Sequence, residues 1–82
     1  MTQMVTFHNK ATIKVQAQIF AGRELVSACL AGPGETHTLS AESMPYDIYF
    51  KNGATGWIVA RELGSNAQTF TLSQNNKHYI IT

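Results

Sequence analysis

One set of residues has the composition of a copper site. His8, Cys29, His37 and Met44 supply the two imidazoles, one thiolate and one thioether that a blue-copper centre uses on an all-β scaffold, and their order along the chain fits. The separations from Cys29 to His37 and from His37 to Met44 exceed the compact ligand loop of such centres. Copper binding is therefore a remote alternative, and the competing interpretation is a buried, apolar Cys29 with two surface histidines.

The residues do not predict a hydrolytic or phosphoryl-transfer centre. Asp47 is the only aspartate, and it lies in an expected strand whose neighbours Tyr46 and Ile48 should face inward. The sequence contains no Gly-X-Ser-X-Gly elbow, phosphate-binding glycine loop, zinc-spaced Cys or His set, or calcium loop. Five carboxylates scattered through 82 residues do not indicate a paired acid–base centre. We expect a protein that is not an enzyme and holds no metal or other cofactor.

Four aromatic residues, Tyr46, Tyr49, Phe50 and Trp57, flank a single predicted hairpin whose tip is residues 52–56. Alternation places Tyr49 on the outer face. An exposed aromatic ring beside hydrogen-bonding groups can hold a sugar ring or an apolar patch of a partner protein, because the ring stacks while the polar groups orient the ligand. The alternative is that Trp57 and Tyr46 are core anchors and that Tyr49 packs across strands.

This hairpin supplies the predicted ligand-binding residues, which are Asp47, Tyr49, Lys51, Asn52, Trp57 and Arg61. They predict a lectin-like, non-enzymatic recognition module that binds a carbohydrate or a protein partner. The alternative function is a membrane-active or self-assembling β-sandwich, either toxin-like or structural. Exposed apolar residues such as Phe20, Ile58 or Tyr49 would then contact lipid or a second copy of the chain.

Periodicity indicates the elements that must position these residues. Apolar side chains recur at every second position in several windows, most clearly at Ile13, Val15, Ala17 and Ile19. With turn signals about every 8 to 12 residues, the pattern predicts a single all-β domain over residues 1–82, a small antiparallel β-sandwich or barrel of seven to eight short strands. The expected strands are residues 4–8, 12–20, 24–30, 35–40, 46–51, 56–63, 68–72 and 78–82.

Two expectations concern the first half of the chain. His8-Asn9-Lys10 is a predicted polar turn that joins the first two strands into an opening hairpin. Residues 24–30 alternate poorly, so they are interpreted as a strand buried on both sides, with a short helix as the competing structure.

A third expectation concerns the hairpin of residues 46–63. Asn52-Gly53 is predicted to supply the positive φ angles of a tight turn, with Gly56 as a bulge. Beyond the turn, alternation places Trp57, Val59 and Leu63 inward, with Arg61 on the same side as Trp57.

Composition limits the partners. Six basic and five acidic residues give a formal charge of +1 without runs of like charge, so we expect neither nucleic-acid binding nor recruitment to anionic membranes by charge. Cys29 is the only cysteine, which excludes an intrachain disulfide and favours a reducing compartment. Residues 1–8 do not resemble a signal peptide, so the chain is expected to be cytoplasmic, or secreted without a visible signal. A small core and open sheet edges favour a homodimer.

Overall fold

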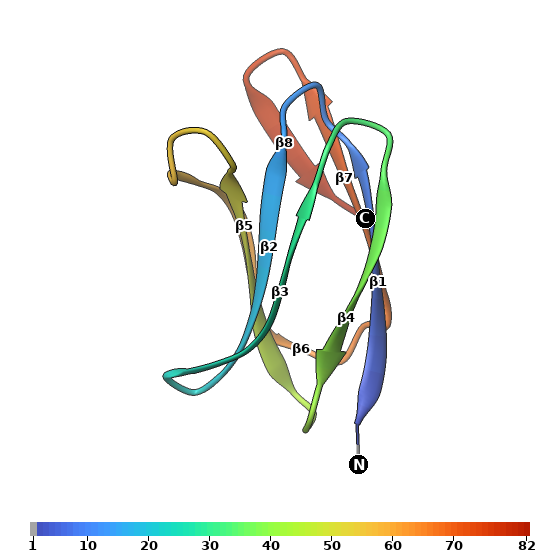
Figure 1. Ribbon diagram of the computed structural model, residues 1–82, viewed down its shortest axis with the longest axis vertical. Coiled ribbons are helices and arrows are strands. Elements are labelled where there is room, and N and C mark those ends of the chain that lie inside the picture. Colours follow the sequence, from blue (N-terminus) through green and yellow to red (C-terminus); the bar gives the residue numbers. More distant parts are fainter. Residues whose placement is uncertain (1) are drawn as a thin grey trace.

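Two facing β-sheets form the structure. The computed structural model describes residues 2–82. Its strands are β1 (Gln3–Lys10), β2 (Val15–Ala21), β3 (Glu24–Ala31), β4 (Thr36–Ala41), β5 (Tyr46–Asn52), β6 (Ile58–Ser65), β7 (Thr69–Asn75) and β8 (His78–Ile81). Sheet A has the order β4-β1-β7-β8 and sheet B the order β3-β2-β5-β6 (Figure 1). This confirms the predicted all-β class as a β-sandwich. The β1–β7 pair runs parallel and the other pairs run antiparallel.

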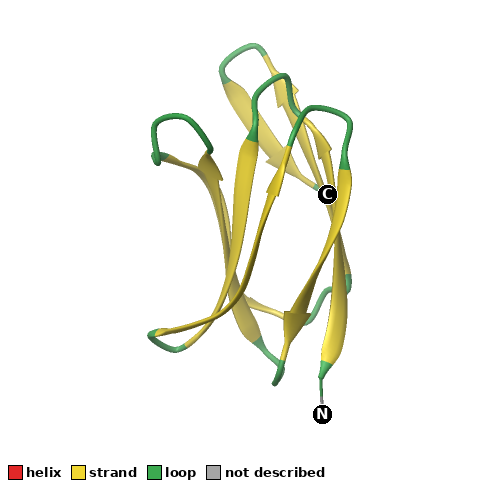
Figure 2. Cartoon of the chain, in the orientation of Figure 1, coloured by secondary structure: helices red, strands yellow, loops and turns green. Residues whose placement is uncertain are grey.

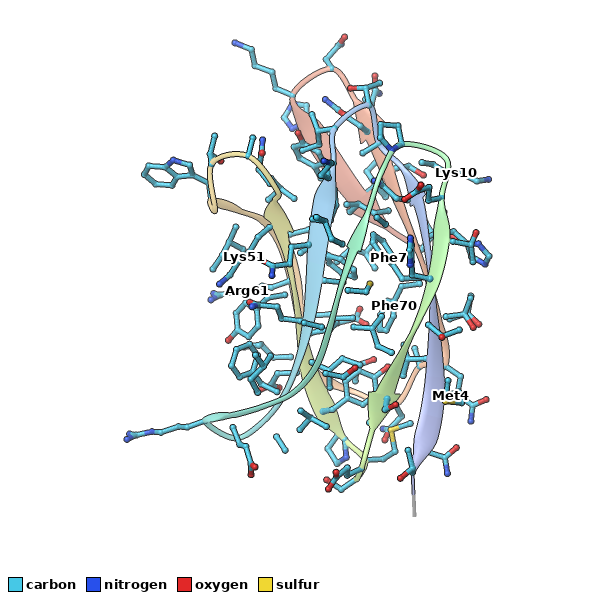
Figure 3. All side chains as sticks on the ribbon, in the orientation of Figure 1. Met4, Phe7, Lys10, Lys51, Arg61 and Phe70 are labelled. Carbon is cyan, nitrogen blue, oxygen red and sulfur yellow. The ribbon has the colours of Figure 1, made fainter. Side chains whose placement is uncertain are left out.

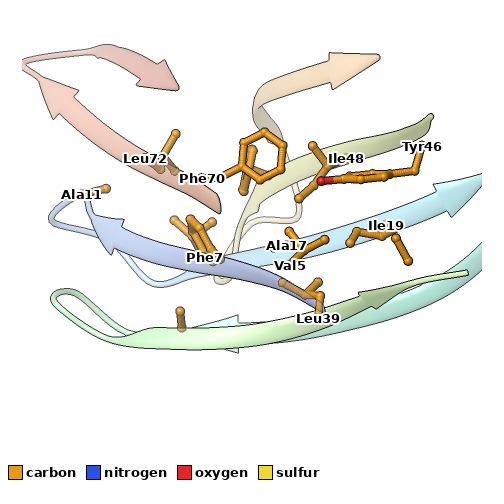
Figure 4. Close-up of a cluster of buried hydrophobic side chains, with 14 residues drawn as sticks. Val5, Phe7, Ala11, Ala17, Ile19, Leu39, Tyr46, Ile48, Phe70 and Leu72 are labelled. Carbon is orange, nitrogen blue, oxygen red and sulfur yellow. The ribbon is translucent and has the colours of Figure 1, made fainter. Parts of the chain in front are cut away.

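The core lies between the sheets because the central strands direct every second side chain inward. The rings of Phe7 from sheet A and Phe50 from sheet B have centroids 4.9 Å apart, and Phe70 lies 5.9 Å from Phe50. Figure 4 shows this cluster with Leu72 and Ile48 beside it. Fully burying one such side chain contributes roughly 1.5 to 3 kcal/mol, so these residues dominate the stability of the sandwich.

The side-chain amide of Asn9, near the end of β1, is buried and forms hydrogen bonds to the backbone of two connections. Its side chain is 1% exposed. The Nδ2 group donates to the carbonyl oxygens of Ile13 and Ala31, each at 3.0 Å, and lies 3.2 Å from that of Gly32. The Oδ1 atom accepts the Ala11 N–H at 3.0 Å. One side chain thereby satisfies backbone groups from the β1–β2 and β3–β4 connections, which would otherwise be buried without partners.

The burial of Asn9 overturns the predicted polar turn at residues 8–10. β1 continues to Lys10, and residues 11–14 cross from sheet A to sheet B. The predicted opening hairpin is therefore also wrong, since β1 pairs with β4 and β7 and does not pair with β2. Alternation shows which face of a strand is buried but carries no information on which strands pair.

The predicted strand over residues 24–30 is confirmed as β3, an edge strand of sheet B, but its expected burial on both sides and the competing short helix are wrong. The segment forms a strand rather than a helix, and it is buried on one side only: Leu25 and Leu30 are exposed, whereas Val26 and Cys29 pack against the core. The blurred alternation reflects a register shift in the β2–β3 pairing between Ile19 and Phe20.

The β5–β6 hairpin forms as predicted, but its turn uses a different geometry. The carbonyl of Asn52 accepts the Gly56 N–H at 2.8 Å, and Asn52 Oδ1 accepts the N–H groups of Ala54 and Thr55 at 2.8 and 3.2 Å. The positive φ angle belongs to Gly56, at 78°, rather than to Asn52 or Gly53. A side-chain cap and one glycine thus close a longer loop than the expected tight turn.

The connections gather at the two ends of the sandwich (Figure 2). We call the end with four connections the upper end and the other the lower end. The upper connections are residues 11–14, 32–35, 53–57 and 76–77, and the lower ones are residues 22–23, 42–45 and 66–68.

Among residues 2–82 the structure contains no helix long and apolar enough to cross a membrane.

Replacing Asn9 with alanine should destabilise the protein by about 2 to 4 kcal/mol, because the change leaves several buried backbone groups without a partner. Urea unfolding at neutral pH would measure the loss. The matched control is Asn66→Ala in an exposed lower connection, which should change the free energy of unfolding by less than about 0.5 kcal/mol. Equal effects of the two substitutions would contradict the role assigned to Asn9.

Tyr46 provides a second buried polar contact, near the lower end. Its ring is 2% exposed, and its hydroxyl donates to the carbonyl oxygen of Ala67. Burial raises the pKa of this phenol, although a hydrogen bond with Ser65 partly opposes the shift. A raised pKa in the folded state means that stability is fully present below the unfolded pKa of about 10 and is lost as the pH rises further.

Tyr46→Phe removes this hydrogen bond and should therefore lower the free energy of unfolding by roughly 1 kcal/mol at neutral pH. The loss should become progressively smaller above about pH 10. The measurement is the difference in unfolding free energy between the wild type and Tyr46→Phe from pH 7 to 11, in which titrations common to both proteins cancel. A difference that stays constant or grows with pH would contradict this account.

Candidate recognition surface

The outer face of sheet B, turned away from the core, carries most of the predicted site. Its register aligns side chains in rows: Gln16 lies beside Lys51, Gln18 beside Tyr49, and Tyr49 beside Arg61. Lys51 and Arg61 lie on the opposite side of this sheet from Phe7 and Phe70 (Figure 3). The residues of the outer face are Gln16, Gln18, Phe20, Leu25, Ala28, Leu30, Asp47, Tyr49, Lys51, Ile58 and Arg61.

Tyr49 lies at the centre of the outer face. Its ring meets that of Phe20 edge-on, with centroids 5.5 Å apart and an interplanar angle of 87°. Arg61 is its partner on β6, and Gln18 is its partner on β2. The Oε1 atom of Gln18 is buried and has no hydrogen-bond partner among the described residues. The centre of the face therefore combines an aromatic pair, a cation and an acceptor that lacks a donor.

Two of the predicted ligand-binding residues are engaged with the backbone. Asp47 Oδ1 accepts the N–H of Gly64 at 2.9 Å, where β6 bulges and Gly64 has a φ of 64°. Asn52 Oδ1 caps the hairpin turn through Ala54 and Thr55. Both side chains thus shape the hairpin, which leaves fewer of their hydrogen-bonding positions for a ligand.

Trp57 departs most from the sequence-based expectation. Its side chain is 76% exposed and Leu63 is 54% exposed, so the predicted inward orientation of both is wrong. Val59 does pack against the core. Trp57 precedes the strand, and the β5–β6 pairing shifts register between Phe50 and Lys51, so a single alternation cannot be extended through the segment. Arg61 consequently points outward with Tyr49, away from the core.

The hairpin tip rests on neighbouring segments at the upper end. The Gly53 N–H donates to the carbonyl oxygen of Lys14 at 2.8 Å. A Cβ atom at Gly53 would lie 3.1 Å from both Lys14 Cγ and Leu30 Cδ1. Only glycine permits this approach without displacing its neighbours. Exposed Leu30 and Ile58 accompany Trp57 at this end of the outer face.

The candidate copper ligands do not converge. His8 is on the outer face of sheet A, where Nδ1 lies 2.8 Å from Thr36 Oγ1, whereas His37 follows Thr36 on the other face and lies 3.2 Å from Glu35 Oε1. Burial raises the pKa of the Cys29 thiol, which disfavours the thiolate that a metal requires. Within residues 2–82 there is no group of three His, Cys, Asp or Glu side chains able to hold a metal ion.

The outer face offers a surface rather than a pocket, since the described part of the chain encloses no ligand-sized cavity. Gln16, Gln18, Phe20 and Leu30 were not among the predicted ligand-binding residues. Gln16 and Gln18 alternate with the inward Val15, Ala17 and Ile19, so the sequence pattern does place them on the outer side of their strand. The missing information was that β2 lies next to β5, which no local pattern encodes.

Comparison of the chain with protein-family models, with curated proteins and with solved structures finds no match. Its function is therefore inferred from the side chains and surfaces described above.

Trp57→Ala should change the free energy of unfolding by less than about 0.5 kcal/mol, because the side chain is mainly in solvent. Phe50→Ala is the matched control from the same hairpin and should cost about 3 to 5 kcal/mol, since Phe50 is completely buried. Chemical denaturation of both variants measures the contrast. A loss at Trp57 comparable to that at Phe50 would mean that Trp57 is a core residue.

Proposed function

We propose that this chain is a non-enzymatic recognition module that binds a protein or carbohydrate partner through the outer face of sheet B. The observation that carries the proposal is the Tyr49–Arg61 pair at the centre of a face that no other described segment covers. Tyr and Arg, with Trp, are the residues that contribute most often to binding hot spots.

Shape and polarity favour a protein over a small molecule. Small ligands bind mainly in concave sites, whereas protein interfaces combine a largely apolar centre with a polar rim. Phe20 and Tyr49 supply the aromatic centre, and exposed Leu25 and Leu30 extend it across β3. Arg61 supplies a cationic contact on the neighbouring edge strand.

A carbohydrate partner is the second candidate. Sugars bind when one ring face packs against an aromatic side chain and adjacent polar groups accept or donate hydrogen bonds. Tyr49 has Gln18 beside it, whose buried acceptor lacks a donor, and Lys51 follows two residues later on the same face. A hydroxyl donor from a sugar would satisfy this acceptor after a change of the Gln18 side-chain conformation.

The expected homodimer stays a prediction. β6 is an open edge of sheet B, but its pairing with β5 is irregular at two places and it carries Arg61 and Glu62 at its middle. Bulges and charges are devices by which natural edge strands avoid pairing with another chain.

The proposal is tested by screening the labelled domain on a glycan array and by identifying proteins that it captures, then reconstituting each binding partner in purified form. Tyr49→Ala and Arg61→Ala should each weaken the reconstituted complex about tenfold or more, as hot-spot residues do. Thr38→Ala, on the outer face of sheet A, is the matched control and should bind as the wild type does.

Circular dichroism and urea unfolding would establish that each variant is folded, and the exposed Arg61 can be changed without disturbing the core. Binding that survives in both Tyr49→Ala and Arg61→Ala but is lost in Thr38→Ala would place the site on sheet A and refute the proposal. A purified partner found on the array rather than by capture would identify the ligand as a glycan.

A further inference from the structure

The fold separates charges that the sequence mixes. Because antiparallel strands reverse direction at each connection, residues distant in the chain collect at the same end of the sandwich. Arg61 and Glu62 lie near the middle of β6. The upper end holds Lys10, Lys14, Lys51 and Lys77 with only Glu35, and the lower end holds Glu24, Glu42 and Asp47 with only Arg23. The formal charge of +1 thus conceals a basic end and an acidic end along the long axis.

The single carboxylate of the upper end is already engaged. Glu35 Oε1 accepts the Gly32 N–H at 2.6 Å and lies 3.2 Å from His37 Nε2. Within the described residues, His37–Glu35 is the only ion pair, so the four lysines have no carboxylate within ion-pairing distance. Their charges are available to an external anion.

Exposed apolar side chains lie at the same end of the sandwich as these lysines. Trp57 is the most exposed large apolar side chain of the described residues, and Ile58 and Leu30, 51% and 50% exposed, lie at the same end. Exposed apolar residues of this kind, surrounded by polar ones, mark interaction sites. Tryptophan in particular is enriched at membrane–water interfaces, where its ring contacts the acyl boundary while its N–H stays hydrated.

We propose that the upper end docks on an anionic lipid bilayer, with Trp57 and Ile58 at headgroup depth and the four lysines meeting lipid phosphates and carboxylates. The lysines come from four separate segments of the upper end, in both sheets, rather than forming one compact cluster. A fluid bilayer can bring a headgroup to each of them, whereas a protein would need fixed acidic groups at matching positions. Leu30, Lys51 and Ile58 also belong to the outer face of sheet B, so docking would cover the upper part of that face and leave Tyr49 and Phe20 at its centre uncovered.

Hydrogen bonds join the connections of the upper end to one another and to β7. Gln74 Oε1 accepts both the N–H and the hydroxyl of Thr12, at 2.9 and 2.8 Å, which joins the β1–β2 connection to β7. Asn9 joins the same connection to that between β3 and β4. The Gly53 N–H bond to Lys14 then fixes the hairpin tip. Docking would therefore require little ordering of the loops, which lowers its entropic cost.

The experiment uses vesicles of phosphatidylcholine alone and of phosphatidylcholine mixed with phosphatidylserine. Because Trp57 is the only tryptophan, its emission reports insertion without a label. We expect a blue shift and cosedimentation with the anionic vesicles only, both weakened by salt as screening increases. Lys77→Gln should lower the partition coefficient about fivefold, as expected for loss of one charge near the surface.

Matched variants separate the elements of the proposal. Arg23→Gln removes a cation from the lower end and should leave partitioning unchanged, whereas Trp57→Ala, followed by cosedimentation, should reduce it. Equal binding to neutral and anionic vesicles, failure to bind either at low salt, or equal losses in Arg23→Gln and Lys77→Gln would overturn the proposal. Binding to soluble heparin without binding to vesicles would also overturn it and would indicate an acidic macromolecule instead.

Discussion

The side-chain amide of Asn9 is the interaction on which the arrangement of the upper end depends. It hydrogen-bonds backbone groups of residues 11, 13, 31 and 32. It therefore fixes how the chain crosses from β1 into sheet B and how it leaves sheet B after β3. Its own backbone adds two bonds, to the Glu35 carbonyl at 2.9 Å and from the Gly34 N–H at 2.7 Å. A hydrophobic side chain could fill the same volume but would leave these groups unpaired in the interior.

The position of the hairpin tip follows from that arrangement. Once residues 11–14 are fixed, the Lys14 carbonyl can accept the Gly53 N–H, and the tip is held beside Leu30. Trp57 therefore projects from a supported turn rather than from a free loop. The same contacts bring Lys14 and Lys51 to one end of the molecule. Packing in the interior thus determines which surface groups can act together.

The outer face of sheet B was partly predictable. Tyr49 and Lys51 were assigned to it correctly, because Tyr46, Ile48 and Phe50 alternate with them without interruption. Trp57 was misassigned because it precedes β6 and the β5–β6 pairing shifts register between Phe50 and Lys51, and a bulge leaves no sequence pattern comparable to alternation. Asp47 was assigned a ligand role, whereas its carboxylate supports the bulge at Gly64. A polar residue on an outer face has the same sequence signal in either role.

The sequence by itself determined the all-β class, the approximate positions of the strands and the inward faces of β2 and β5. These depend on local alternation and turn residues, whose physics acts over a few positions. Only the tertiary structure decided that β1 lies between β4 and β7, that Asn9 is interior, and that lysines from four segments share one end. Those outcomes depend on contacts between residues far apart in the chain. Net charge and composition are sums, and a sum does not record where in space its members lie.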